Sequence, residues 1–122
     1  MEVILEVSEN VLSARLLGEL DHHGVAKVRG DIDQALEIHN LKHLIFDFEK
    51  VTYTDSSGIG VVLGRYRRLS EQGGSVVIAC CSKNVRTILN MAGIFSLMDY
   101  ADTKEEAAEL LRKKEVSRCR EY

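Results

Sequence analysis

The chain opens with two segments that are typical of β-strands, residues 1–7 and 11–17. In the second, the apolar positions recur every two residues from Leu12, which is the period of a half-buried strand. Because only a short polar turn separates the two segments, we expect an antiparallel hairpin. Between residues 22 and 38 the apolar spacing changes to three and four residues, which predicts a helix with Asp21 as its N-cap.

Strand and helix patterns alternate through the rest of the chain. In chain order they predict a central strand at 44–48, a helix from 59 to 69 that Gly73 and Gly74 end, a buried strand at 75–79, a short helix over 85–89 that Gly93 ends, and an edge strand at 95–100. Thr103 and Glu106 have the spacing of a capping box for a last helix.

This order of elements predicts an α/β fold. We expect a mixed four- to five-stranded sheet with about four helices packed mainly on one side. A length of 122 residues fits a single domain, which we assign to residues 1–115, with a frayed tail at 116–122. The content of 45% hydrophobic and 29% charged residues is ordinary for a globular protein.

The charge, the apolar runs and the cysteine content indicate which partners and which location to expect. A formal net charge of -3 argues against direct binding to nucleic acid. We see neither a long apolar run nor a signal peptide, so we expect no membrane partner and a cytoplasmic location. The number of cysteines is odd, and we see no export signal, which favours reduced thiols at all three positions, Cys80, Cys81 and Cys119. We expect the adjacent pair to be small buried residues at the end of a strand.

Residues 55–58, Asp-Ser-Ser-Gly, lie between a predicted strand and a predicted helix. A hydroxyl at a helix N-terminus is accessible, and a phosphate on it would meet backbone N–H donors and the positive end of the helix dipole. The simpler alternative is that Asp55 or Ser56 caps the helix and does nothing more. Local physics treats Ser56 and Ser57 nearly alike, so it does not choose between them as phosphate acceptors.

Other patterns give weaker hypotheses. The glycines that follow the motif match no nucleotide-binding loop, so we expect Gly60 and Gly64 to allow close packing of the helix on the sheet. The chain has four histidines that could serve as a base for Ser57, but it lacks the Gly-x-Ser-x-Gly elbow of a hydrolase. Residues 21–23, Asp-His-His, are too close together for a metal site. We therefore expect no catalytic residue, metal or cofactor.

Four segments taken together resemble a known family. They are residues 18–23 (Gly-Glu-Leu-Asp-His-His), 55–66, 72–74 (Gln-Gly-Gly) and 91–95 (Met-Ala-Gly-Ile-Phe). The chain is similar through them to the STAS-domain anti-sigma factor antagonists, and the first segment points to the sporulation branch of that family. The resemblance runs from about residue 11 to about residue 100.

The resemblance implies a partner switch in a protein that is not an enzyme. The unphosphorylated antagonist would bind an anti-sigma factor that is also a serine kinase, and so release a sporulation sigma factor. Phosphorylation of Ser57 would end the binding, and a PPM-type serine phosphatase would restore it. The family places Asp21 at the partner-binding surface, and because both helix N-termini can emerge at one end of the sheet, we expect a common patch. Its expected members are Asp21, Asp55, Ser56, Ser57, Gly58 and Ile59.

Alternative interpretations stay open at this point. The chain could be a stress-response antagonist that acts on another sigma factor by the same mechanism. It could also be a ligand-sensing STAS module whose serine is never phosphorylated, or a small hydrolase that uses Ser57.

Overall fold

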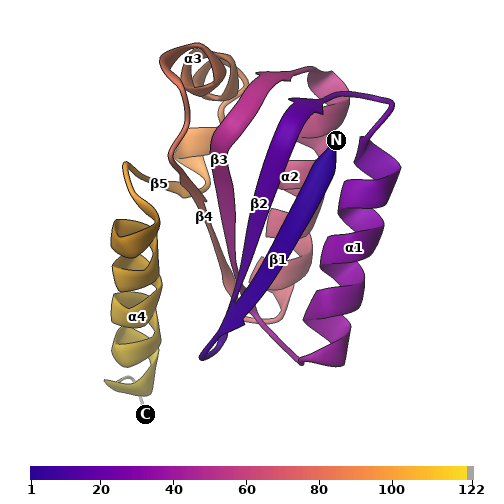
Figure 1. Ribbon diagram of the computed structural model, residues 1–122. Helices are drawn as coiled ribbons and strands as arrows, with labels where there is room; N and C mark the ends of the chain where they lie inside the picture. Colours follow the sequence, from indigo (N-terminus) through magenta and orange to yellow (C-terminus); the bar gives the residue numbers. More distant parts are fainter. Residues whose placement is uncertain (121–122) are drawn as a thin grey trace.

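A five-stranded sheet with the spatial order β1-β2-β3-β4-β5 forms the centre of the protein (Figure 1). The computed structural model describes the backbone of residues 1–120 and the side chains of residues 1–115. The first two strands are antiparallel and all later neighbours are parallel. The strands are β1 (Glu2–Ser8), β2 (Val11–Leu20), β3 (His43–Thr54), β4 (Ser75–Ala79) and β5 (Asp99–Ala101).

Helices cover both faces of this sheet unequally. They are α1 (Val25–Ile38), α2 (Ser56–Glu71), α3 (Lys83–Met91) and α4 (Lys104–Arg120), with a 3₁₀ turn at Ile94–Ser96. The main core joins one face of the sheet to α1, α2 and α3, and it contains the rings of Phe46 and Phe48, which meet edge to face. Of the described helices, only α4 lies on the opposite face (Figure 1), where Ala107 and Leu111 pack on Ile45 and its neighbours. The predicted α/β class and the unequal helix distribution are confirmed.

β2 and β3 are both longer than their sequence patterns indicate. The patterns end at residues 17 and 48, whereas the strands run to Leu20 and Thr54, which pair with each other. The register slips between Arg15 and Leu17 and again after Gly18. Such irregularities interrupt the two-residue alternation, which explains why the pattern misses the last three residues of β2 and the second half of β3.

The start of α1 corrects one prediction. Asp21 is not its N-cap: the helix begins at Val25, after Gly24, and no side chain caps it. The Asp21 carbonyl instead accepts hydrogen bonds from the N–H groups of Gly24 and Val25, at 3.0 and 3.2 Å. A turn therefore separates β2 from the helix, which leaves the Asp21 carboxylate beside the helix start and not within it.

Two other boundaries differ from the sequence pattern. β5 covers only residues 99–101 and not 95–100, because Gly93 at φ +79 turns the chain into the 3₁₀ segment first. The capping box of α4 is shifted: Thr103 Oγ1 accepts from the Glu106 N–H, but the Glu106 carboxylate accepts from the N–H of Asp102. The backbone of α4 is helical to Arg120. In the predicted frayed tail, residues 116–122, the side chains lie outside the described part of the chain, as does the backbone of the last two residues.

The glycines of α2 do not act as their spacing suggested. A Cβ atom added to Gly60 or Gly64 would meet no atom within 4 Å, so neither glycine is needed for close packing on the sheet. Gly58 is the exception, because its Cβ would collide with Thr54 Oγ1 and would lie 2.5 Å from the Leu20 carbonyl oxygen. The first turn of α2 thus approaches the ends of β2 and β3 more closely than any other residue type would allow.

Two alanine substitutions on α2 test this close approach. We expect Gly58→Ala to lower the free energy of unfolding by about 1–3 kcal/mol, because the backbone of two strands must move. Gly60→Ala is the matched control, and we expect it to raise the free energy of unfolding by up to about 1 kcal/mol through helix propensity. Urea unfolding followed by circular dichroism measures both. Equal effects of the two substitutions would contradict the assigned packing.

Candidate functional site

The loops that follow β2 and β3 meet at one end of the sheet. The two strands are parallel neighbours (Figure 1), and Leu20 is in register with Thr54. The Leu20 carbonyl accepts hydrogen bonds from the Asp55 N–H at 3.3 Å and from Thr54 Oγ1 at 3.2 Å. Thr54 is 2% exposed, so this link is shielded from water. It fixes the start of α2 against the end of β2.

Asp55 connects the two loops through its side chain. Its Oδ1 accepts a hydrogen bond from the Gly58 N–H at 3.1 Å and caps α2, as the simpler sequence hypothesis expected. Its Oδ2 accepts from the His22 N–H at 3.3 Å, and the His22 ring nitrogen Nδ1 lies 3.6 Å from the same oxygen. These donors favour the charged carboxylate. The Gly58 N–H contributes most, ahead of the N–H groups of His22 and Ser57, and the pKa of Asp55 is lowered.

Asp21 is held in a similar way on the neighbouring loop. Its Oδ1 accepts a hydrogen bond from the His23 N–H at 3.0 Å, which is the main reason that the pKa of Asp21 is lowered. The rings of His22 and His23 are in contact, with centroids 3.9 Å apart. The site therefore presents two ionised carboxylates with a pair of exposed imidazoles beside them.

The serine hydroxyls are free of hydrogen bonds to the described residues. Ser56 is exposed and Ser57 is partly exposed, so exposure alone favours Ser56. The backbone N–H of Ser57 points toward the Asp55 carboxylate, while its hydroxyl forms no hydrogen bond to a described residue that modification would have to break. Both side chains stand in the first turn of α2, where the helix dipole is positive.

The other expected members of the surface differ in what they can offer a partner. Gly58 is buried and serves the close approach of α2 to β2 and β3. Ile59 is partly buried and packs against the main core. The bond between His22 and Asp55 does not follow from the sequence pattern, in which His22 is one of four possible bases and part of the family-like segment 18–23. The two residues are 33 positions apart in the chain.

Catalytic chemistry finds little support in this geometry. Among the described residues, no histidine contacts the Ser57 hydroxyl, and His43 lies at the opposite end of β3, bonded to Glu115 at 2.7 Å. Within the same part of the chain, no group of three or more His, Cys, Asp or Glu side chains could hold a metal ion.

The adjacent cysteines directly follow β4 and are half-buried free thiols. Burial raises the pKa of Cys81 to about 12, and it also raises the pKa of Cys80. Both therefore stay protonated at neutral pH and are poor nucleophiles. The side chain of Cys119 lies outside the described residues.

Comparison with known proteins identifies the family. A family model described as the STAS domain matches residues 2–107. The chain belongs to the STAS-domain family. This STAS domain is 34% identical to the anti-sigma F factor antagonist of Paenibacillus polymyxa, over 88% of this chain and 92% of that protein. It is also 34% identical to the anti-sigma F factor antagonist of Lysinibacillus sphaericus, over 87% of this chain and 90% of that protein.

Solved structures agree with these relatives. The unphosphorylated form of the anti-sigma factor antagonist SpoIIAA superposes with a TM-score of 0.72 at 34% identity, covering 91% of this chain and 98% of that one. The phosphorylated form of the Bacillus SpoIIAA gives 0.70 at 36% identity, covering 88% and 97%. The resemblance noted from the sequence is confirmed. This STAS domain is an anti-sigma factor antagonist of the SpoIIAA type, from a family of regulators and not of enzymes.

One further observation concerns membranes. Within the part of the chain that the structure describes, no helix is both long and apolar enough to span a bilayer.

The hydrogen bonds to Asp55 predict how the stability of the domain depends on pH. Because the folded-state pKa of this carboxyl is lowered, its contribution is present above its unfolded pKa of about 4 and is lost as pH falls through the lower folded value. Asp55→Asn keeps a capping oxygen but cannot ionise. We expect it to have a lower Tm than the wild type at pH 6, and the difference to shrink as the pH approaches about 2. Thermal melts across this range measure it, and a difference that stays constant with pH would contradict the assignment.

Proposed function

We propose that this STAS domain is a partner-switching regulator of a sporulation sigma factor. Its unphosphorylated form binds an anti-sigma factor that is also a serine kinase, and the sigma factor is thereby released. The kinase phosphorylates Ser57 and the complex dissociates, after which a PPM-type serine phosphatase regenerates the binding form. The protein acts in the cytoplasm, where sigma factors work.

One observation carries this proposal more than any other. A protein that is 34–36% identical to this chain along nearly its whole length, SpoIIAA, exists in phosphorylated and unphosphorylated forms. The hydroxyl of Ser57 in this chain is unbonded and partly exposed at the start of α2. The stress-response alternative has less support, because the anti-sigma-B factor antagonist of Bacillus subtilis is 24% identical, over 86% of this chain and 94% of that protein.

The electrostatics of the site explain how one phosphate could act as a switch. A phosphoserine carries about -1.5 to -2 charges at neutral pH. In the free domain the helix terminus offsets this by only about 0.3–1 kcal/mol, and the Asp55 carboxylate already occupies the Gly58 N–H. In a complex the same group must also lose its water, at a cost of several kcal/mol. The modification should therefore prevent binding and leave the fold intact.

Phosphorylation by the kinase is the first test. After incubation with the cognate anti-sigma kinase and ATP, we expect intact mass spectrometry to show the addition of a single phosphate. The addition should be lost in Ser57→Ala and kept in Ser56→Ala, and phosphopeptide mapping should place it on Ser57. A phosphate on Ser56, or none in the wild type, would overturn the assignment of the acceptor or of the switch, respectively.

A charge mimic tests the repulsion mechanism. We expect Ser57→Asp to weaken binding to the kinase by roughly 100-fold, because an unpaired charge must be desolvated, with the Tm little changed. Ser70→Asp, at the exposed far end of α2, is the matched control and should bind like the wild type. Isothermal titration calorimetry measures both. Tight binding by Ser57→Asp, or its failure to fold, would refute the charge-repulsion account.

Asp21 provides an independent test of the surface. Because its carboxylate caps no helix and bonds only within its own loop, we expect Asp21→Asn to leave the Tm nearly unchanged and to weaken kinase binding roughly 10-fold. Asp31→Asn, on α1 and paired with Lys27, is a control for the loss of one negative charge. A large fall in Tm without a specific loss of binding would instead indicate a structural role for Asp21.

A further inference from the structure

A largely buried ion pair joins α1 to α2. The Nε atom of Arg65 on α2 lies 3.0 Å from Oδ1 of Asp33 on α1, and these side chains are only 11% and 26% exposed. Arg68 Nη1 lies 3.0 Å from the same Asp33 oxygen, while its Nη2 lies 3.1 Å from Glu37, whose side chain is 70% exposed. Because an exposed ion pair is screened by water, Asp33 and Arg65 form the stronger link between the helices.

The geometry of this pair is poor for stability. Nε and Nη1 of Arg65 and Oδ1 of Asp33 are buried, and none of them forms a hydrogen bond with a described residue. Burial lowers the pKa of the Arg65 guanidinium, and the Asp33 carboxylate opposes that change. A buried ion pair without good hydrogen bonds does not recover its desolvation cost, and apolar side chains of similar size are often as stable or more stable. The pair therefore needs an explanation other than stability.

The pair lies at the same depth along both helices. Because α1 and α2 follow the parallel strands β2 and β3, both begin at the same end of the sheet and run in the same direction (Figure 1). Asp33 is eight residues after Val25, the first residue of α1. Arg65 is nine residues after Ser56, the first residue of α2. At about 1.5 Å per residue, the pair is roughly 12–14 Å from both helix starts, and it opposes sliding of one helix along the other.

Apolar packing alone defines this register less strictly. Val28 and Ile32 of α1 belong to the same core as Val61 and Val62 of α2. Apolar burial is non-directional, and a core of the right volume loses its unique arrangement before it loses stability. A charge pair has one preferred partner position, and fixing a register is the best-attested use of buried polar groups.

We infer that Asp33 and Arg65 are positioning residues for the partner-binding surface. Their ion pair keeps the start of α1, with Asp21 before it, in register with the start of α2, where Ser57 lies. The bond between the His22 N–H and the Asp55 carboxylate ties the two loops at the surface, and the ion pair holds the two helices behind them. The effect on kinase binding rests on the proposed partner switch.

Replacing both residues with apolar side chains separates positioning from stability. In the double variant Asp33→Leu with Arg65→Met, we expect a Tm equal to or above that of the wild type. The KM for phosphorylation by the kinase should rise roughly 10-fold with kcat unchanged, because binding through two loops is weakened while the acceptor serine is unaltered. An unchanged KM, or a fall in Tm of more than about 5 °C, which would make the pair a structural one, overturns the inference.

A second double variant controls for the loss of an ion pair as such. Glu109→Gln with Arg112→Gln also removes one acid and one base, but from α4 on the other face of the sheet. We expect its KM and kcat to match those of the wild type. If its KM rose as much as that of the apolar variant, the effect would not depend on the register of α1 and α2, and the inference would be wrong.

Relaxation-dispersion NMR of the free protein tests the register without the kinase. In the apolar variant we expect the backbone amides of residues 21–23 and 55–58 to show microsecond-to-millisecond exchange, which the wild type and the α4 variant lack. Its absence from the apolar variant would refute the positioning role. If the kinase failed to bind even the wild type, the proposed function would fail, and this measurement would still decide the inference.

Discussion

The parallel pairing of β2 with β3 is the interaction on which the site depends. The two strands stay paired from Val11 and His43 to Leu20 and Thr54, through two irregularities in register. Because parallel strands end on the same side of a sheet, both of the loops that follow begin at one end. The buried bonds to the Leu20 carbonyl then fix one loop against the other. Without the last residues of this pairing, the loops that carry His22 and Asp55 would not be joined.

The close approach at Gly58 lets a single carboxylate serve both loops. Asp55 uses one oxygen to cap α2 and the other to bond the backbone of His22. It remains charged because these donors lower its pKa. The Gly58 N–H, which is the main donor to the Asp55 carboxylate, is therefore already bonded and is not available to a phosphate on Ser57. A phosphate added there would increase the negative charge of the site more than the helix terminus could compensate.

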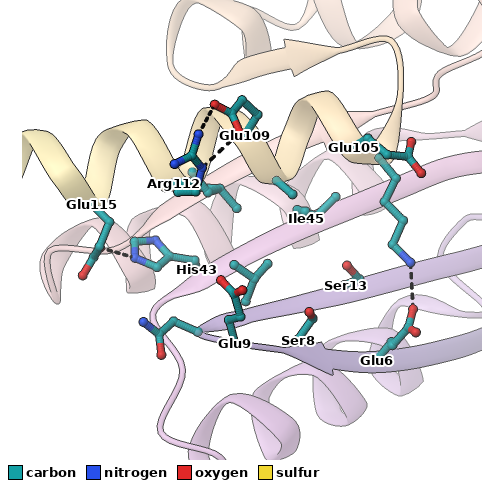
Figure 2. A pocket seen from close by; sticks show the side chains of 15 residues that line it. Glu6, Ser8, Glu9, Ser13, His43, Ile45, Glu105, Glu109, Arg112 and Glu115 are labelled. Atoms are coloured by element: carbon teal, nitrogen blue, oxygen red, sulfur yellow. Dashed lines mark hydrogen bonds and ion pairs between the residues drawn. The ribbon is translucent and has the colours of Figure 1, made fainter.

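The two faces of the sheet separate this surface from the rest of the molecule. The large core under α1, α2 and α3 supports the Ser57 end, whereas α4 covers the other face with a smaller core. Ion pairs of Lys104, Lys114 and Glu115 hold α4 along its length. Beside α4 lies a cavity that is lined by residues of this helix, of the β1–β2 hairpin and of the start of β3 (Figure 2).

The sequence by itself determined the class of fold, the order of elements and the position of the Ser57 motif at a helix start. Local signals suffice for these, since periodicity and the Asp55 cap act over a few residues. The tertiary structure alone decided the rest. The true ends of β2 and β3 depend on pairing, and the role of Gly58 depends on backbone atoms from two strands. The contact of His22 with Asp55 joins residues far apart in the chain, and no local pattern carries such information.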